Sequence, residues 1–268
     1  MRLWNRRELI LAGVAVAGSF RVVAQQTKDS KPVTGREALI GDLVAANRIL
    51  AAQGIVDGLG HVSARTAPNA ARYLLARAIA PALVTIADIG EYDLDSNPIS
   101  GDSTTAYVER FIHGEIYRVR PDVNAVVHCH APALIPFGIT KVPLRPVYIM
   151  SYFVGDGIPV FEIREAIGTT NLAISNREQG RALARVVADH PAALMRGHGA
   201  VIVGSSLPEV VGRSVYLELN ARLQAQSMML GKDITYLDAG EVKAMKEKAS
   251  YLRAWDLWKR EAMKDNAR

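Results

Sequence analysis

The sequence has 268 residues, of which 49% are hydrophobic and 22% charged, and it contains one cysteine, Cys129. The hydrophobic content excludes an intrinsically disordered chain, and a lone cysteine excludes both a disulfide scaffold and a zinc site built on several thiolates. Any metal site must therefore use histidine and carboxylate ligands. The net charge of +5 would favour a nucleic-acid partner only if the basic residues gathered on one face.

The first 24 residues have the pattern of an export signal. Basic residues precede an apolar run at 9–20, and small residues follow up to Ala24. As a helix this run is about 18 Å long, too short for a hydrocarbon core of ~30 Å, so no stable membrane span is expected after signal cleavage. The pair Arg6-Arg7 resembles a twin-arginine signal, although Asn5 stands where Ser or Thr is usual. We therefore expect a periplasmic protein, with an uncleaved membrane anchor as the alternative.

The expected signal also accounts for most of the charge imbalance. Four of the 32 basic residues and one of the 27 acidic residues lie in 1–24, which leaves 28 against 26 and a net charge of +2. No basic run remains, so nucleic acid is not expected as a partner. Residues 25–35 are polar and are expected to be a linker into one domain at 36–268.

Helical and strand patterns alternate irregularly along this domain. Apolar residues at helical spacing predict helices at 36–52, 104–119, 179–188 and 207–229, followed by a charged helical tail at 240–268. Short apolar segments predict strands at 73–75, 83–86, 91–94, 124–130, 192–195 and 200–203. This irregular order favours a layered α/β fold over a barrel, which requires regular alternation.

A glycine-rich turn at 58–60 leads into a short strand that carries polar residues. Because strand side chains alternate between two faces, three of them point the same way: His61, Ser63 and Arg65. Farther along, three polar residues recur every four positions on the predicted helix 104–119 and share one of its faces: Glu109, His113 and Tyr117. A solvated glutamate and a histidine at the core edge are the alternative to a functional role for this face.

Three further histidines suggest a metal site. His128 and His130 are two residues apart in the predicted strand 124–130, so both imidazoles lie on one face and Cys129 lies on the other. Such a pair can bind one metal ion, and a hydrogen-bonded surface pair is the alternative. His198 lies between two glycines, which permit a tight turn close to another strand. A simple turn histidine explains this last pattern equally well.

Together these segments resemble the class II aldolase/adducin family in order and spacing, over roughly residues 36–229. The motifs that carry the resemblance are Gly60-His61-Val62-Ser63-Ala64-Arg65, Glu109-Arg-Phe-Ile-His113-Gly-Glu-Ile-Tyr117, Arg120-Pro-Asp-Val-Asn-Ala-Val-Val-His128-Cys-His130 and Arg196-Gly-His198-Gly. The resemblance implies a three-layer α/β/α sandwich around a mostly antiparallel central sheet. It also implies a homotetramer with the active site at a subunit interface.

The family pattern assigns roles to five residues. His128, His130 and His198 would bind one divalent metal ion per subunit, Glu109 would be the catalytic acid or base, and His113 would support the site. Three neutral imidazoles with an open position are typical of a catalytic metal site, and either Zn²⁺ or Mn²⁺ suits them. The implied chemistry is carbon–carbon cleavage through a metal-bound enolate, with carbon dioxide or an aldehyde leaving. Glu109 would move the proton, aided if burial raises its pKa.

The phosphate-binding positions of the family's sugar-phosphate aldolases differ in this chain. Those enzymes carry Gly-Asn, Thr-Gly and Ser-Ser, whereas the corresponding residues here are Gly60-His61, Ala76-Arg77 and Tyr107-Val108. The hydroxyl groups, and the small residues that leave backbone donors accessible to a phosphate, are missing at these positions. A phosphorylated sugar is therefore not expected as the substrate. The motifs Gly-His-Val-Ser, Glu-Arg-Phe-Ile-His-Gly and Pro-Leu-Arg-Pro instead resemble the decarboxylase branch, which includes enzymes for hydroxypyridine dicarboxylates.

This branch implies a small carboxylate substrate, most plausibly a hydroxylated aromatic or oxo acid. The side chains expected to bind it are His61, Ser63, Arg77 and Arg145. A structural ion pair is the alternative for each arginine. The chain departs from the branch in having Ala76, Ala78 and Ile149 where Ser, Ser and His are frequent, which leaves the substrate open. Two other functions remain: an aldolase-type lyase for a non-phosphorylated hydroxy-oxo acid, and a non-catalytic adducin-like scaffold.

Overall fold

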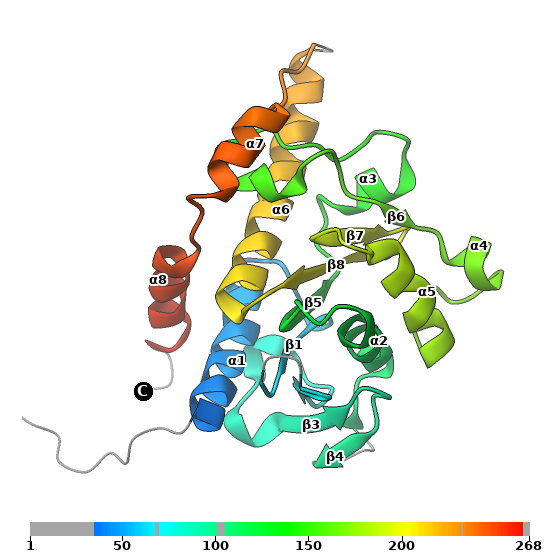
Figure 1. Ribbon diagram of the computed structural model, residues 1–268, viewed down its shortest axis with the longest axis vertical. Helices are drawn as coiled ribbons and strands as arrows, with labels where there is room; N and C mark the ends of the chain where they lie inside the picture. The colour runs from blue at the N-terminus through cyan, green and yellow to red at the C-terminus, as the bar shows by residue number, and fades with distance from the viewer. Residues whose placement is uncertain (1–34, 68–69, 101–104, 232, 265–268) are drawn as a thin grey trace, which may run out of the picture. The chain divides into compact units, whose positions relative to one another are not determined.

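A central β-sheet organises the chain (Figure 1). The computed structural model describes residues 35–67, 70–100, 105–231 and 233–264, and all of these belong to one structural unit, Thr34–Arg268. The expected export signal at 1–24 and all but the last residue of the expected linker lie outside the described residues. Among the helices that are described, none combines the length and the apolar character needed to cross a membrane.

Within the described residues the sheet has eight strands in the order β4-β3-β2-β1-β5-β8-β7-β6. The strands are β1 His61–Arg65, β2 Arg72–Ala76, β3 Ile89–Asp93, β4 Pro98–Ser100, β5 Ala125–Cys129, β6 Val160–Phe161, β7 Ala192–Met195 and β8 Gly199–Gly204. Strand β5 lies between β1 and β8, and it pairs with both in antiparallel fashion. Three strands that carry or border the predicted site residues are therefore neighbours in the middle of the sheet.

The sheet is mixed, which corrects the expectation of a mostly antiparallel one. The pairs from β4 to β7 are antiparallel, but β6 runs parallel to β7. Helices α4 and α5 lie in the connection from β6 to β7, and a parallel pair needs a crossover of this kind. The sequence pattern did not reveal β6 because it has only two residues.

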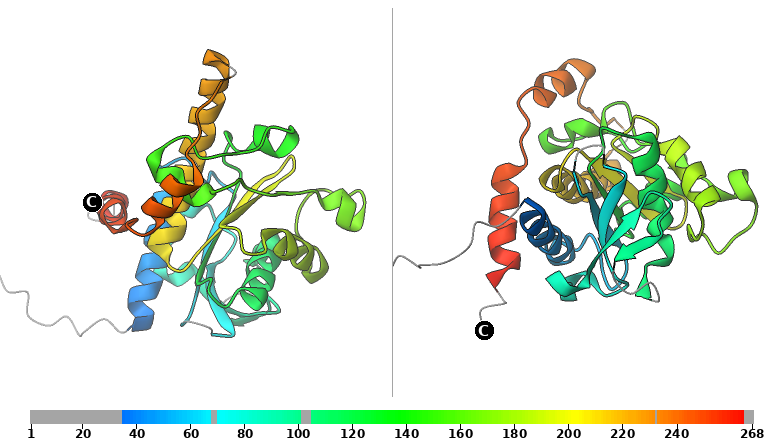
Figure 2. Two further views of the ribbon diagram at one scale, coloured as in Figure 1. Left: turned by 45° about the horizontal axis from the view of Figure 1, so that its top comes forward. Right: turned by 60° about the horizontal axis from the view of Figure 1, so that its bottom comes forward.

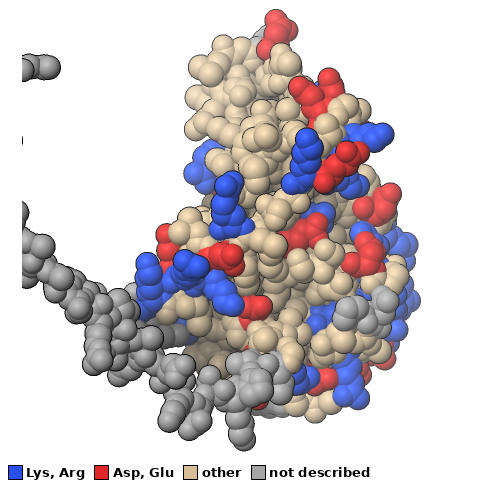
Figure 3. Space-filling view, turned by 60° about the vertical axis from the view of Figure 1, so that its left-hand side comes forward, with Lys and Arg blue, Asp and Glu red and all other residues tan. Residues whose placement is uncertain are grey.

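Helices cover both faces of the sheet, as Figures 1 and 2 show, so the predicted α/β/α sandwich is confirmed. The helices are α1 Gly35–Ala52, α2 Phe111–Val119, α3 Ile135–Ile139, α4 Ile163–Ile167, α5 Arg177–Val187, α6 Leu207–Leu230, α7 Ala239–Lys246 and α8 Leu252–Ala262. Helices α1, α6 and α8 share one apolar core with one face of the sheet, and α2 and α5 share a second core with the other. Figure 3 shows one surface of the molecule, on which acidic and basic side chains are interspersed.

Strand β5 contributes to both cores because its side chains alternate. Val127 and Cys129 belong to the core beneath α1 and α6, whereas Val126 belongs to the core beneath α2 and α5. By the same alternation His128 lies on the α2 side of the sheet. Cys129 is fully buried on the opposite side, away from His128.

Three predicted elements differ from the structure. The predicted strand at 83–86 is wrong, because two short 3₁₀ helices, η1 Pro81–Leu83 and η2 Ile86–Asp88, occupy this part of the chain. Pro81 stands at the start of η1, where its fixed φ favours a helical turn. The predicted helix at 104–119 begins later, with η4 Val108–Arg110 leading into α2. The predicted helical tail is divided into α7 and α8.

Candidate metal centre

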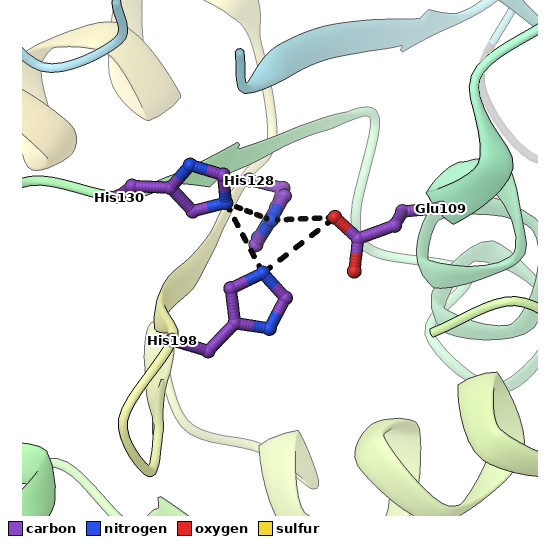
Figure 4. Close-up of side chains that lie close together, drawn as sticks. All are labelled: Glu109, His128, His130 and His198. Carbon is purple, nitrogen blue, oxygen red and sulfur yellow. Dashed lines mark hydrogen bonds and ion pairs between the residues drawn. The ribbon is translucent and has the colours of Figure 1, made fainter. Parts of the chain in front are cut away.

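Four side chains bring their polar atoms together on the α2 side of the sheet (Figure 4): Glu109, His128, His130 and His198. One ligand atom from each lies within 4.8 Å of the others. Glu109 comes from η4, His128 and His130 from the end of β5, and His198 from the turn between β7 and β8. Five of the six histidines of the chain lie in this region, since His61 and His113 are close behind it.

Backbone register places His198 beside the β5 histidines. Strands β5 and β8 are paired so that Cys129 lies opposite Ala200, and the turn before β8 therefore reaches the end of β5. Gly197 has a φ of +64°, which only glycine adopts freely. At Gly199 a Cβ atom would lie 2.0 Å from the carbonyl oxygen of Cys129. The two glycines flanking His198 are thus needed for the turn and for its close approach to β5.

Glu109 reaches the cluster because its backbone departs from helical geometry. Its φ of −88° and ψ of 16° fall in the sparsely populated bridge region, where many active-site residues are found. Its Oε2 lies 3.1 Å from Nε2 of His128 and 3.6 Å from Nε2 of His198. Its Oε1 accepts a 2.9 Å hydrogen bond from the backbone N–H of Ile174. The carboxylate is therefore fixed at both oxygens.

Backbone carbonyls determine which ring nitrogen of two histidines carries hydrogen. Nδ1 of His128 lies 3.1 Å from the oxygen of Ala200, and Nδ1 of His198 lies 3.1 Å from the oxygen of Leu172. A carbonyl only accepts hydrogen bonds, so each Nδ1 must donate, and each neutral ring has a lone pair on Nε2. This is the arrangement by which histidine ligands are oriented in metalloproteins.

The donor set fits a divalent cation better than a hydrogen-bonded cluster. Nε2 of His130 lies 3.1 Å from Nε2 of both His128 and His198. If His130 carries its hydrogen on Nε2, it can donate that hydrogen to Nε2 of His128 or to Nε2 of His198, but not to both. The Nε2 lone pair of the remaining histidine then faces the carboxylate of Glu109. Converging lone pairs repel one another unless a positive charge lies between them. Three imidazoles and a carboxylate are ligands that Zn²⁺ and Mn²⁺ accept.

The pKa values of the cluster follow from burial and from its own charges. Burial and the neighbouring His128 and His198 lower the pKa of His130 to about 4. Burial alone would raise the pKa of Glu109, but hydrogen bonding and attraction from His128 and His198, which act when those rings carry a hydrogen on Nε2 and a positive charge, outweigh it and bring this pKa well below its usual value. The condition under which burial would aid proton transfer, a raised pKa at Glu109, is therefore not met. Glu109 is a carboxylate at neutral pH, able to accept a proton.

A cavity of about 340 Å³ opens beside the cluster. Most of its walls are apolar, and its polar side chains come from the predicted site: His61, Glu109 and His130, together with Tyr107. The hydroxyl of Tyr107 donates a 2.6 Å hydrogen bond to the carbonyl oxygen of Ile79, another wall residue. Sequence reasoning missed Tyr107 as a site residue, although it lies only two positions before Glu109. The cavity therefore offers polar atoms at the metal cluster and apolar surface elsewhere.

His61 joins the cavity to a row of buried polar side chains. Its Nδ1 lies 2.6 Å from Nε2 of His113, whose Nδ1 lies 2.6 Å from Oγ of Ser63. Oγ of Ser63 is in turn 2.8 Å from the hydroxyl of Tyr117. Burial lowers the pKa of His61, with a further contribution from His113, and burial with His128 lowers the pKa of His113 to about 3. Both rings are therefore neutral at ordinary pH.

Three of the predicted substrate ligands lie outside the cavity of the single chain. Ser63 has no exposed surface and is bonded to His113 and Tyr117 instead. Arg77 forms a 2.6 Å ion pair with Asp88. The guanidinium of Arg145 lies 4.1 Å from the centre of the Tyr236 ring and lines a separate pocket of about 360 Å³. Of the four residues expected to bind substrate, the structure brings His61 to the cavity.

Comparison with known proteins places these features in a family. Residues 41–225 match the profile of the class II aldolase and adducin N-terminal domain. Decarboxylase tropJ of Talaromyces stipitatus is 35% identical over 243 residues, which are 81% of this chain and 91% of that protein. A 3,4-dihydroxyphthalate decarboxylase of Arthrobacter keyseri is 29% identical over 231 residues, 80% of this chain and 89% of the relative. The structure of L-fuculose 1-phosphate aldolase from Glaciozyma antarctica superposes with a TM-score of 0.71 at 20% identity, over 87% of this chain and 93% of that one, and has the same fold.

Proposed function

Because the chain belongs to the class II aldolase and adducin family, we propose that it is a divalent-metal-dependent lyase that decarboxylates a small hydroxylated aromatic or oxo acid. The observation that carries this proposal is the convergence of three imidazoles and one carboxylate at the edge of a cavity of about 340 Å³. Two relatives that match about 80% of the chain are named decarboxylases, which supports carbon dioxide as the leaving group.

His128, His130 and His198 would hold the metal ion, with Glu109 beside it. The ion would supply Lewis-acid stabilisation of the negative charge that develops on substrate oxygens. The apolar walls around Leu59 would hold the hydrocarbon part of the substrate and exclude water.

Glu109 would move the proton that the reaction requires. Loss of carbon dioxide leaves an electron pair on carbon, and this carbon must gain a proton to give the product. Since Glu109 is a carboxylate with a lowered pKa, it can accept a proton from the hydroxyl group of a hydroxylated aromatic acid or, for an oxo acid, from a water molecule that is left as hydroxide. It would then return that proton to the carbon, so that the enzyme ends each turnover in its starting state.

The test combines metal analysis with a substrate screen. We expect about one divalent ion per chain after purification without chelators, and carbon dioxide release from one or more hydroxybenzoic, dihydroxyphthalic or 3-oxo acids. His130→Ala should lose both the metal and the activity. His190→Ala is the matched control, because His190 is the one histidine outside the site region. An aldehyde product would support the aldolase alternative, and a metal-free, inactive wild type would support a scaffold.

Arg77 and Arg145 stay predicted ligands of the substrate carboxylate. Since neither lines the cavity of its own chain, we propose that they contribute across the subunit interface of a homotetramer. Light scattering should then give four times the mass of one chain. Replacement of Arg145 by Ala should raise KM for the acid while the metal content stays unchanged.

Export to the periplasm is a further part of the proposal. It is supported by the pattern of Arg6-Arg7 followed by an apolar run and small residues up to Ala24. Mass spectrometry of the protein from its native host should find an N-terminus close to residue 25. An N-terminus that still includes residues 1–24 in the membrane fraction would favour the uncleaved anchor.

A further inference from the structure

Four buried side chains form a continuous hydrogen-bonded row from the cavity into the protein interior. In order they are His61, His113, Ser63 and Tyr117, joined by contacts of 2.6, 2.6 and 2.8 Å. None of the four is more than 2% exposed. His61 is the member that lines the cavity, and Tyr117 lies at the far end. Because burial disfavours charge, the two imidazoles are neutral and each carries a single ring hydrogen.

Two arrangements use the hydroxyl hydrogen of Ser63 within the row. A third, in which Ser63 accepts from both neighbours, leaves that buried hydrogen without an acceptor among the described residues. In the first, every donor points toward the cavity: the hydroxyl of Tyr117 donates to Ser63, Ser63 donates to Nδ1 of His113, and Nε2 of His113 donates to Nδ1 of His61. In the second, every donor points away from the cavity and Ser63 donates to Tyr117. The members are coupled, because a neutral imidazole that accepts at one nitrogen must carry its hydrogen on the other.

The far end of the row favours the first arrangement. In the second, Tyr117 accepts from Ser63, and its other partner is the backbone of Val126, which lowers the pKa of Tyr117 as an N–H donor does. Among the described residues the hydroxyl hydrogen of Tyr117 then has no acceptor. The guanidinium of Arg65 lies over the Tyr117 ring, 4.7 Å from its centre. A guanidinium has donors only and cannot accept this hydrogen. Leaving the hydrogen of a buried hydroxyl without an acceptor is costly, so the first arrangement is the more stable one.

We infer that Tyr117, Ser63 and His113 are positioning residues that keep the ring hydrogen of His61 on Nε2, so that His61 presents a fixed N–H donor to the substrate. Nδ1 of His61 is occupied by His113, and no partner for Nε2 is found within the described part of the chain. Nε2 is thus the ring nitrogen left for a ligand in the cavity that His61 lines. The inference rests on the proposed function only in naming an acid as that ligand.

This assignment separates two roles that a histidine beside a metal site can have. A His61 with a lone pair on Nε2 would be a base, whereas one with a hydrogen there stabilises negative charge on a substrate oxygen. A fixed donor needs no reorientation when that charge develops during loss of carbon dioxide. Proton transfer then falls to Glu109, which is a carboxylate.

The hydrogen on His61 can be located without any substrate. Histidine-selective ¹⁵N labelling of the Zn²⁺-loaded protein distinguishes the two neutral tautomers, because protonated and unprotonated ring nitrogens have well-separated frequencies. We expect the hydrogen on Nε2 of both His61 and His113, with signals assigned by comparison with His61→Gln and His113→Gln. A hydrogen on Nδ1 of His61 would overturn the inference. This result does not depend on whether an acid is found to be decarboxylated. The inference about His61 and the proposed function can therefore be contradicted independently of each other.

Kinetics provide the second arm once a substrate is known. Ser63→Ala removes the donor to His113, so a mixture of His61 tautomers and a fall in kcat of about 10–100-fold are expected, with KM nearly unchanged. Ser214→Ala is the matched control, because Ser214 is equally buried and, among the described residues, its hydroxyl bonds to the carbonyl of Val210 alone. His61→Gln, which retains an N–H donor, should keep more activity than the apolar His61→Leu. Equal losses in these two variants, or a single unchanged His61 tautomer in Ser63→Ala, would contradict the inference.

Discussion

The metal centre and the buried row beside it use the same residue type in opposite ways. At the metal centre, the outer nitrogens of His128 and His198 donate to backbone carbonyls, and the inner nitrogens converge as acceptors. In the row, both nitrogens of His113 have a side-chain partner, and donors and acceptors alternate. The converging nitrogens of the metal centre need a cation between them, whereas the row satisfies its own donors and acceptors at every ring nitrogen except Nε2 of His61. In both regions, the hydrogen-bond partner of one ring nitrogen therefore decides whether the other nitrogen of the same histidine donates or accepts.

The largest expected effect comes from removing a ligand of the metal centre. His198→Ala deletes one of the converging nitrogens, so we expect loss of bound metal and activity at background level. The melting temperature should fall to that of chelator-treated wild type, because an ion that binds only the native state stabilises it. Measurement requires metal analysis and thermal unfolding with and without chelator. If His198→Ala kept its metal, the convergence of these side chains would have another explanation.

Gly199→Ala should disturb the metal centre without touching a ligand. A Cβ at this position would lie 2.0 Å from the carbonyl oxygen of Cys129, so the turn that carries His198 must move away from β5. We expect a loss of about 3 kcal/mol in the free energy of unfolding and a weaker affinity for the metal. Gly41→Ala in α1 is the control, since nothing lies within 4 Å of its added methyl group. Unchanged metal affinity in Gly199→Ala would show that the turn tolerates displacement.

The buried row should make the protein sensitive to acid. The folded-state pKa of His113 is about 3, against an ordinary value of 6.5, so the unfolded chain binds a proton that the folded chain refuses between these pH values. The stability due to neutral His113 is thus present above pH 6.5 and is lost as the pH falls toward 3, by about 1.4 kcal/mol per pH unit.

Denaturant unfolding of the metal-free protein between pH 7 and pH 4.5 measures this slope. His113→Gln, which cannot be protonated, should unfold with a smaller slope than wild type, and His190→Gln should leave the slope unchanged. If His113→Gln retained the full slope, the acid sensitivity would have to come from other groups, such as His61, whose pKa burial also lowers.

Local patterns predicted the parts of the site that depend on local geometry. The spacing of His128 and His130 predicted that both imidazoles share a face, and their Nε2 atoms lie 3.1 Å apart. The two glycines around His198 predicted a turn close to another strand, and the β5–β8 pairing provides that strand. The layered fold followed from the irregular order of helices and strands, together with the family resemblance.

The remaining features depend on contacts between residues distant in the sequence. The Arg145 segment is held by Asn220 and Gln224 of α6, about 75–80 positions away, and no local pattern indicates this. The N–H of Ile174 and the carbonyl of Leu172 fix Glu109 and His198 through backbone groups, which every residue possesses. Sequence patterns therefore cannot single out these two positions.

The smallest expected effect comes from Tyr107, which lines the cavity beside the metal centre and the buried row. Tyr107 packs its ring 4.5 Å from that of His61, and its hydroxyl donates to the carbonyl of Ile79. Tyr107→Phe keeps the ring and loses one hydrogen bond, so we expect about 1 kcal/mol lower stability, unchanged metal content and a KM within about twofold of wild type. Tyr73→Phe, another buried tyrosine whose hydroxyl is bonded, controls for the loss of stability. A large rise in KM in Tyr107→Phe alone would mean that its hydroxyl contacts the substrate, and the cavity would then recognise its ligand from the wall as well as from the metal centre.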